Sequence, residues 1–218
     1  MSLDPDELAD VAEHFGVADE QVHRDHAISH LSAALSREVP ESVIFFGGTA
    51  LSRTHLSDLR LSEDVDLIAV GHRTDVARSI AVAFDSRPVR RELGRLAWRP
   101  ELHTTNGSAH AVVTTATGHA IKVQLLAGHG YPSWPTEVVA IRQRYSDAAA
   151  ASLRVLTRDA FAAAKLSAWT DRRASRDLYD LWAMVSEGMV TAGQTRIAVD
   201  QETAADIVAR AWDVVRVR

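Results

Sequence analysis

The sequence contains no cysteine, which excludes disulfide bonds and thiolate metal sites. It also lacks any apolar run close to the roughly 20 residues that a transmembrane helix needs. The N-terminal segment MSLDPDELAD is acidic and does not have the basic and then apolar pattern of a secretory signal. We therefore expect a cytoplasmic protein with no membrane partner.

An excess of basic residues is also absent, because the formal net charge is −5. This balance argues against wrapping a long nucleic acid by charge alone. Arginines nevertheless cluster in two places, and either cluster could contact phosphate, with a solvated helix face as the alternative. The clusters are Arg87, Arg90, Arg91, Arg95 and Arg99, and then Arg172, Arg173 and Arg176.

The hydrophobic pattern predicts helices, then a small sheet, then a helical C-terminal half. Residues 128–136 hold two glycines and two prolines and form the clearest linker. The helices expected before the linker are 5–38, 50–56 (capped by Thr49) and 74–84, and those after it are 138–145, 158–169, 175–187 and 202–216. The expected strands are 42–46, 65–70 and a hairpin of 109–115 with 120–126.

The strongest local signal is Ser62-Glu63-Asp64-Val65-Asp66-Leu67. Because side chains alternate along a strand, Asp64 and Asp66 are expected on one face, with Val65 and Leu67 in the core. Two neighbouring carboxylates tolerate each other when a divalent cation lies between them, and Mg²⁺ prefers carboxylate and phosphate oxygens. The pair predicts a metal site, although Asp-x-Asp alone is also common on exposed strands and loops.

Upstream, Gly47-Gly48-Thr49-Ala50-Leu51 lies between a predicted strand and a predicted helix. Glycines at such a position let backbone N–H groups approach a phosphate. For the glycines taken alone, a plain tight turn is the alternative. Together, the glycine turn and the paired aspartates predict a phosphate site that faces a metal site.

This combination resembles the polymerase-β-type nucleotidyltransferases, and more closely the AbiEii and MenT toxins of bacterial toxin–antitoxin systems. The further segments that carry the resemblance are Arg24-Asp25, Ile121-Lys122-Val123, Lys165-Leu166-Ser167-Ala168, Arg172 and Arg176-Asp177-Leu178-Tyr179-Asp180-Leu181. The resemblance implies an α/β (α+β) fold. A polymerase-β-like nucleotidyltransferase core with a small mixed sheet would occupy residues 1–130, and a helical C-terminal lobe residues 131–218, with the active site in the cleft between them.

The resemblance also implies a metal-dependent transferase that moves a nucleotide from an NTP to an RNA acceptor, with the tRNA 3′ end favoured, and so blocks translation. A cognate antitoxin would be its partner. Asp64 and Asp66 would hold Mg²⁺ or Mn²⁺, and they would form the catalytic group with Lys165 and Asp177. The residues implied to bind the nucleotide are Gly47, Gly48, Thr49, Ser62, Lys122, Arg172 and Arg176.

One departure from the superfamily concerns the general base. A third carboxylate is often found near position 124, where this chain has Gln124. A neutral amide cannot accept a proton from an attacking hydroxyl. The base is then Asp64, Asp66, Asp177, Asp180 or a metal-bound water. Gln124 also gives some support to an inactive interaction module, and a small-molecule or protein hydroxyl is the alternative acceptor.

Two further patterns have structural alternatives. Lys165 and Arg172 are about two turns apart on one expected helix, and with Asp177 they could equally form salt bridges between two helices. His23 and the nearby His26 and His30 fall on one helical arc. Because three ligands from one helix rarely converge on one metal ion, no zinc site is predicted from them.

Overall fold

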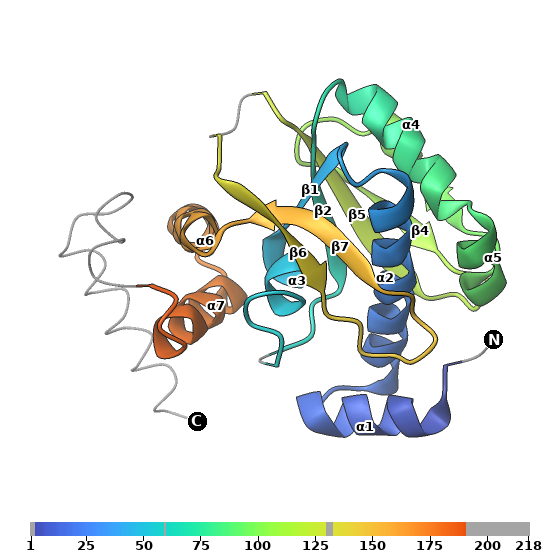
Figure 1. The fold of residues 1–218 in the computed structure, drawn as a ribbon, viewed down its shortest axis with the longest axis horizontal. Coiled ribbons are helices and arrows are strands. Elements are labelled where there is room, and N and C mark those ends of the chain that lie inside the picture. The colour runs from blue at the N-terminus through green and yellow to red at the C-terminus, as the bar shows by residue number, and fades with distance from the viewer. Residues whose placement is uncertain (1–2, 59, 130–132, 191–218) are drawn as a thin grey trace. The chain divides into compact units, whose positions relative to one another are not determined.

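The computed structural model describes residues 3–58, 60–129 and 133–190 (Figure 1). The chain divides into two compact units, one ending at Val155 and the other beginning at Leu156. Each unit is described by itself. Within the described ranges, we find no helix with the length and apolarity that a membrane crossing requires.

A seven-stranded mixed sheet of order β3-β4-β5-β2-β1-β7-β6 forms the centre of the first unit. The strands are β1 (Val43–Phe46), β2 (Asp64–Ala69), β3 (Ala97–Arg99), β4 (His110–Thr114), β5 (Ala120–Ala127), β6 (Thr136–Ile141) and β7 (Ala151–Leu156). Strand β2 is central, and it pairs antiparallel with β1 and parallel with β5. The expected hairpin is confirmed as the antiparallel pair of β4 and β5.

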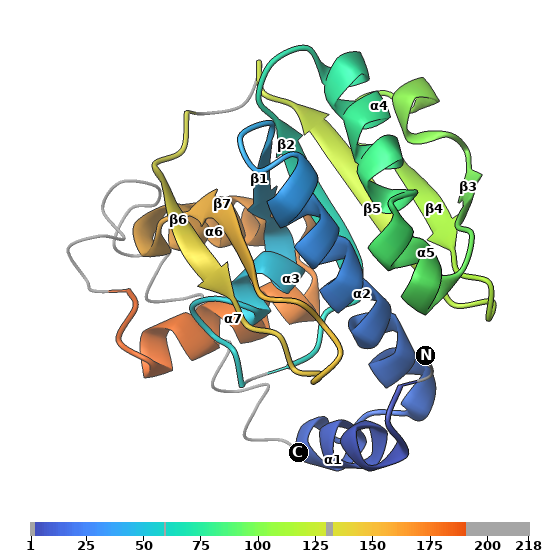
Figure 2. The same cartoon turned by 45° about the vertical axis from the view of Figure 1, so that its right-hand side comes forward.

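Helices cover the sheet of this unit. They are α1 (Pro5–Phe15), α2 (Asp19–Glu38), α3 (Gly47–Ser52), α4 (Arg73–Phe84) and α5 (Arg87–Leu93), with a 3-10 turn η1 (Leu102–Thr104). Figure 2 shows α2, α4 and α5 lying together over one face of the sheet. The helical spacing of Ile28, Leu31 and Leu35 is confirmed, because all three side chains are fully buried on α2.

The described part of the second unit consists of α6 (Arg158–Arg172) and α7 (Ser175–Ser186), which pack together. The hydroxyl of Thr157 caps α6 by accepting a hydrogen bond from the backbone N–H of Ala160 at 3.4 Å. Helix α6 ends at Arg172, and its C-cap residue Arg173 has a left-handed φ of 50°. Both helices were expected, whereas the expected helix 202–216 lies outside the described residues.

The structure corrects several expectations about helices and strands. Residues 138–145 do not form a helix, because the β-branched segment Thr136–Ile141 forms β6 beside β7 at the edge of the sheet. Strand β7 and helix α5 were not expected at all. Helix α3 begins at Gly47, so Thr49 lies inside it and does not cap it. Strands β6 and β7 extend the sheet of the first unit, which ends at Val155. The division into a nucleotidyltransferase core of residues 1–130 and a helical lobe of residues 131–218 stays a prediction.

Candidate functional site

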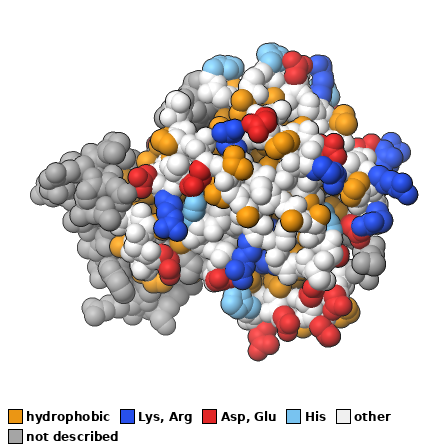
Figure 3. Space-filling model, in the orientation of Figure 1, with side chains coloured by type: hydrophobic (Ala, Val, Ile, Leu, Met, Phe, Trp, Pro, Cys, Tyr) orange, Lys and Arg blue, Asp and Glu red, His pale blue; other side chains and the backbone are white. Residues whose placement is uncertain are grey.

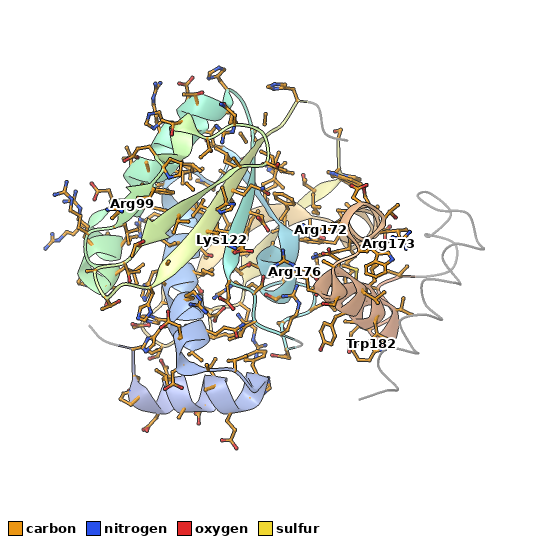
Figure 4. All side chains as sticks on the ribbon, turned by 180° about the vertical axis from the view of Figure 1, so that it is seen from behind. Arg99, Lys122, Arg172, Arg173, Arg176 and Trp182 are labelled. Carbon is orange, nitrogen blue, oxygen red and sulfur yellow. The ribbon has the colours of Figure 1, made fainter. Side chains whose placement is uncertain are left out.

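Strand β2 presents Asp64 and Asp66 on one face of the sheet. The intervening Val65 and the following Leu67 are buried, and both aspartates are only partly buried, as the alternation predicted. On the parallel neighbour β5, Lys122 stands opposite Asp64 and Gln124 stands opposite Asp66. Paired residues share a face, so two carboxylates, one ammonium group and one amide lie side by side. Figure 4 labels Lys122 on this strand.

The turn after β1 brings its backbone against the second aspartate. Gly47 has a φ of 77°, a conformation that residues with a side chain rarely adopt. A Cβ atom added to Gly47 would lie 2.1 Å from Oδ2 of Asp66. The glycine is therefore required both for the conformation of the turn and for the space that the carboxylate occupies.

The rest of the turn is joined to the segment before β2. A Cβ atom on Gly48 would lie 3.0 Å from the hydroxyl oxygen of Ser62 and 2.8 Å from Nη2 of Arg60. The buried hydroxyl of Thr49 donates a hydrogen bond to the backbone carbonyl of Asp64. Thr49 thus fixes the start of β2 against α3, and Ser62 lies beside the glycine turn.

A buried polar network supports this turn from behind. Arg53 directly follows α3 and is fully buried, and its Nη2 donates to both Oδ1 and the backbone carbonyl of Asp25, each at 2.7 Å. The hydroxyl of Tyr145 donates to Oδ2 of Asp25 at 3.0 Å. Burial and the adjacent Asp25 carboxylate raise the pKa of Tyr145 above its ordinary range, so the phenol stays a donor. The sequence reasoning singled out Asp25 but missed Arg53 and Tyr145.

The neighbouring Arg24 contacts the aspartate motif itself. Its Nε lies 2.5 Å from Oε2 of Glu63, and its Nη1 lies 3.0 Å from Oε1 of Glu20. Since Glu63 directly precedes Asp64, both residues of the Arg24-Asp25 pair on α2 support the site. Arg24 holds the start of β2, and Asp25 holds the end of α3.

In the second unit, Asp177 is fully buried and is held by two cations. Arg172 donates from Nε and Nη2 to its two carboxylate oxygens at 2.6 and 2.8 Å, and Nζ of Lys165 lies 3.4 Å from Oδ1. The same Nζ lies 2.6 Å from Oδ2 of Asp180. Burial opposes ionisation of Asp177, but the hydrogen bonds and charges of Arg172 and Lys165 outweigh it and lower its pKa. Arg176 lies in the first turn of α7, and Figure 4 labels it with Arg172.

The cluster of arginines before the hairpin lies on and after α5, where all five side chains are exposed. In Figure 3, basic side chains gather at the right-hand edge, where Figure 1 places α5. Two members already have acidic partners: Arg90 pairs with Asp85, and Nε of Arg91 lies 2.5 Å from Oε1 of Glu92.

The three histidines of α2 do not all converge, in agreement with the expectation from the sequence, but two of them lie beside an aspartate from another segment. His26 and His30 turn their Nε2 atoms toward the carboxylate of Asp147, which lies in the loop between β6 and β7. His23 instead stacks on His119, with ring centroids 4.6 Å apart. The third member, Asp147, is 121 residues from His26, so no local pattern could identify it.

The glycine turn against one aspartate, and the second aspartate on the same face of the sheet, define the chain as having a nucleotidyltransferase fold. The family model described as "Nucleotidyl transferase AbiEii toxin, Type IV TA system" matches residues 31–210. The chain therefore belongs to the AbiEii nucleotidyltransferase toxin family.

The solved structures that are similar to the chain include a toxin and an antibiotic-resistance factor. The nucleotidyltransferase toxin MenT4 from Mycobacterium tuberculosis H37Rv has a TM-score of 0.63 and 25% sequence identity, over 82% of this chain. The chain spans only 64% of the length of MenT4. The antibiotic-resistance factor ANT(2'')-Ia has a TM-score of 0.51 and 12% identity, over 90% of this chain and 98% of that one, and shows a likeness of fold alone. No curated protein sequence matches the chain.

Proposed function

We propose that the protein transfers a nucleotidyl group from an NTP to the 3′ hydroxyl of an RNA, with tRNA as the acceptor. The observation that carries this proposal is the contact of Gly47 with Asp66, beside Asp64 on the same strand. In the reaction, the acceptor oxygen forms a bond to the α-phosphorus and the bond to the bridging oxygen breaks. The acceptor loses its proton, and pyrophosphate leaves.

The two aspartates suit a hard divalent cation. Both are only partly buried, they share one face, and carboxylate oxygens are what Mg²⁺ or Mn²⁺ prefers. We propose that Asp64 and Asp66 hold this ion, which when bound would neutralise phosphate charge and lower the pKa of a bound hydroxyl. Lys122, opposite Asp64, and the turn at Gly47 and Gly48 would contact the phosphates.

Ser62 and Thr49, the other two residues of the first unit that were expected to bind the nucleotide, differ in their access to it. Ser62 lies beside the glycine turn and is proposed to donate to a phosphate oxygen. Thr49 is fully buried and donates to the Asp64 carbonyl, so we propose that it positions the aspartates and does not contact the nucleotide.

The general base is better assigned to the first unit than to the second. Asp177 accepts hydrogen bonds from Arg172 and Lys165, and its pKa is lowered, which makes it a weak proton acceptor. We propose that Asp177 positions Lys165 and Arg172. Lys165 would contact the NTP triphosphate, with Arg172 and Arg176 as further phosphate contacts. The proton would then pass to Asp64 or Asp66.

A labelling experiment tests the function and the acceptor together. The purified protein, free of antitoxin, is incubated with each labelled NTP, Mg²⁺ or Mn²⁺, and total RNA. We expect one NTP to label a tRNA-sized species at its 3′ end. Label in a small molecule or a protein instead would keep the chemistry and overturn the acceptor. An absence of transfer with all four NTPs, while the protein remains folded, would favour the inactive interaction module.

The family membership also motivates a cellular proposal. A toxin that modifies tRNA 3′ ends would block aminoacylation, so expression alone should slow growth, and a cognate antitoxin should relieve it. Growth that is equally slow with a protein in which both Asp64 and Asp66 are replaced by asparagine would contradict this proposal.

A further inference from the structure

Three ligand-type side chains converge within the first unit, outside the proposed nucleotide site. They are His26 and His30, one helical turn apart on α2, and Asp147 in the loop between β6 and β7. The two histidines are buried, and the aspartate is nearly so, with 11% of its side chain exposed. From this geometry we propose that the three residues bind one Zn²⁺-type transition-metal ion, which fastens the loop to α2.

The distances between the donor atoms fit a tetrahedral ion. Nε2 of His26 lies 3.1 Å from Nε2 of His30 and 3.0 Å from Oδ2 of Asp147. Nε2 of His30 lies 3.6 Å from the same Oδ2. With zinc bonds of about 2.0–2.1 Å, the donor atoms of a tetrahedral site are separated by about 3.3 Å. An ion therefore fits among the three atoms with small adjustments of the side chains.

Hydrogen bonding alone cannot satisfy the same contacts. An imidazole nitrogen carries one proton at most. If Nε2 of His26 donates to Asp147, it has no lone pair with which to accept from His30. If it accepts from His30, it has no proton for Asp147. A metal ion removes this conflict, because it takes a lone pair from both nitrogens and from a carboxylate oxygen.

The chemistry of the donors separates this site from the one on β2. Two imidazoles with one carboxylate favour Zn²⁺ and its neighbours in the transition series, whereas Mg²⁺ prefers oxygen ligands. Two histidines four residues apart on a helix form a recurrent zinc-binding pair. With three protein ligands, the fourth position would be filled by a water molecule.

The loop that carries Asp147 is already joined to α2 and α3 by several hydrogen bonds. Gln143 donates from Nε2 to the carbonyl of Ser29 at 3.0 Å, and Arg53 donates to the carbonyl of Arg142 at 3.1 Å. Tyr145 also packs edge-on against His26, with centroids 5.0 Å apart. An ion at His26, His30 and Asp147 would thus stabilise the same loop that completes the Asp25 network.

The test is metal binding to the full chain, stripped of metal, in which Asp64 and Asp66 are both replaced by asparagine to remove the other metal site. Zn²⁺ is titrated against a chromogenic chelator. We expect one tight equivalent that an excess of Mg²⁺ does not displace, and a Tm that rises by about 5–10 °C when Zn²⁺ is at 100 times its Kd. In that background, H30Q and D147N should each weaken binding by more than about 100-fold, beyond the loss typical of an outer-shell partner.

The matched control is H23Q, which changes a histidine on the same helix that stacks on His119 and should leave Zn²⁺ binding unchanged. Because substitutions of buried residues can impair folding, the chain with His26, His30 and Asp147 intact is also loaded with Co²⁺. Visible absorption of a four-coordinate site, with paramagnetic broadening of the His26 and His30 resonances, is expected. Two outcomes would overturn the proposal: no tight equivalent, or equal binding by H30Q and D147N.

Discussion

The backbone of Gly47 lies directly against the carboxylate of Asp66, since a Cβ atom on the glycine would come within 2.1 Å of Oδ2. The glycine turn and the aspartate strand, which are separate motifs in the sequence, therefore pack directly against each other. The turn has to lack a side chain so that the carboxylate can lie beside it. Thr49 on α3 donates a hydrogen bond to the backbone carbonyl of Asp64, so this aspartate is also held against α3.

The first prediction follows from this contact. G47A should lower nucleotide transfer by about 100-fold, because displacing Asp66 by about 1 Å would misplace the proposed metal. It should also lose about 1–2 kcal/mol of folding free energy, as a side chain at positive φ does. The matched control is G16A, where φ is 63° and nothing lies within 4 Å of the added atom. Equal activity of the two variants, measured at equal folded fraction, would show that the contact is dispensable.

The second prediction concerns the aspartates. D64N and D66N should each lower transfer by at least about 100-fold while the fold is kept, because a bound ion supplies several kcal/mol to the transition state. The control D75N removes an exposed carboxylate whose side chain is 71% exposed on α4. Transfer rates and circular dichroism are measured with increasing Mg²⁺ and Mn²⁺. Wild-type rates in both variants would reject the metal site.

Much of the first unit could be predicted from local pattern. The alternation in Asp64–Leu67 predicted the shared face of the carboxylates, and the Gly118 turn predicted the hairpin of β4 and β5. Strands β6 and β7 could not be predicted in the same way. Their apolar residues, such as Val138 and Val139, fit either period over so short a segment, and pairing in the sheet decides between them.

The site residues that could not be identified from the sequence were missed for a different reason, because their partners lie far away along the chain. Arg53 reaches Asp25 on a helix 28 positions away, and Asp147 reaches His26 over 121 positions. Spacing arguments identify residues on one helix or strand, so the histidines of α2 were noticed but their partner was not. Long-range contacts of this kind become visible only when the chain is folded.

The third prediction separates two roles of Lys165. K165M should lower NTP use, and it should also cost about 3–5 kcal/mol of folding free energy, since it removes a cation that lies 2.6 Å from the buried carboxylate of Asp180. Adding D180N removes that charge and should restore much of the stability but none of the activity. Tm and the KM for NTP are measured for both. Recovery of activity together with stability would mean that Lys165 is only structural.

The fourth prediction is a dependence of stability on pH. The pKa of Asp177 lies below its ordinary value of 3.8 in the folded protein, so its ionised form stabilises the fold above that pH. This contribution should disappear as the pH falls through the folded pKa. The Tm of the wild type should therefore exceed that of D177N at pH 7, and the gap should narrow below about pH 4. If the difference in Tm between the wild type and D177N stayed constant down to the lowest pH at which both fold, the ion pairing of Asp177 with Arg172 would be contradicted.

The fifth prediction concerns how RNA is bound. Arg95 and Arg99 are exposed, whereas Arg90 and Arg91 already pair with acidic neighbours, so the first two are the better candidates for phosphate contact. The double variant R95A/R99A should weaken RNA binding uniformly across sequences. Each lost contact should reduce the slope of log affinity against log salt by about 0.7 for a single strand. Because the chain carries a net charge of −5, attraction to RNA has to come from local patches, and the loss of affinity on removing two charges should be measurable.

The matched variant R90A removes an arginine that pairs with Asp85, and it should change the slope less. Binding is measured by fluorescence anisotropy of a labelled tRNA at several salt concentrations, with NTP binding as the check that the nucleotide site is intact. An unchanged slope in R95A/R99A would place the RNA contact elsewhere on the protein.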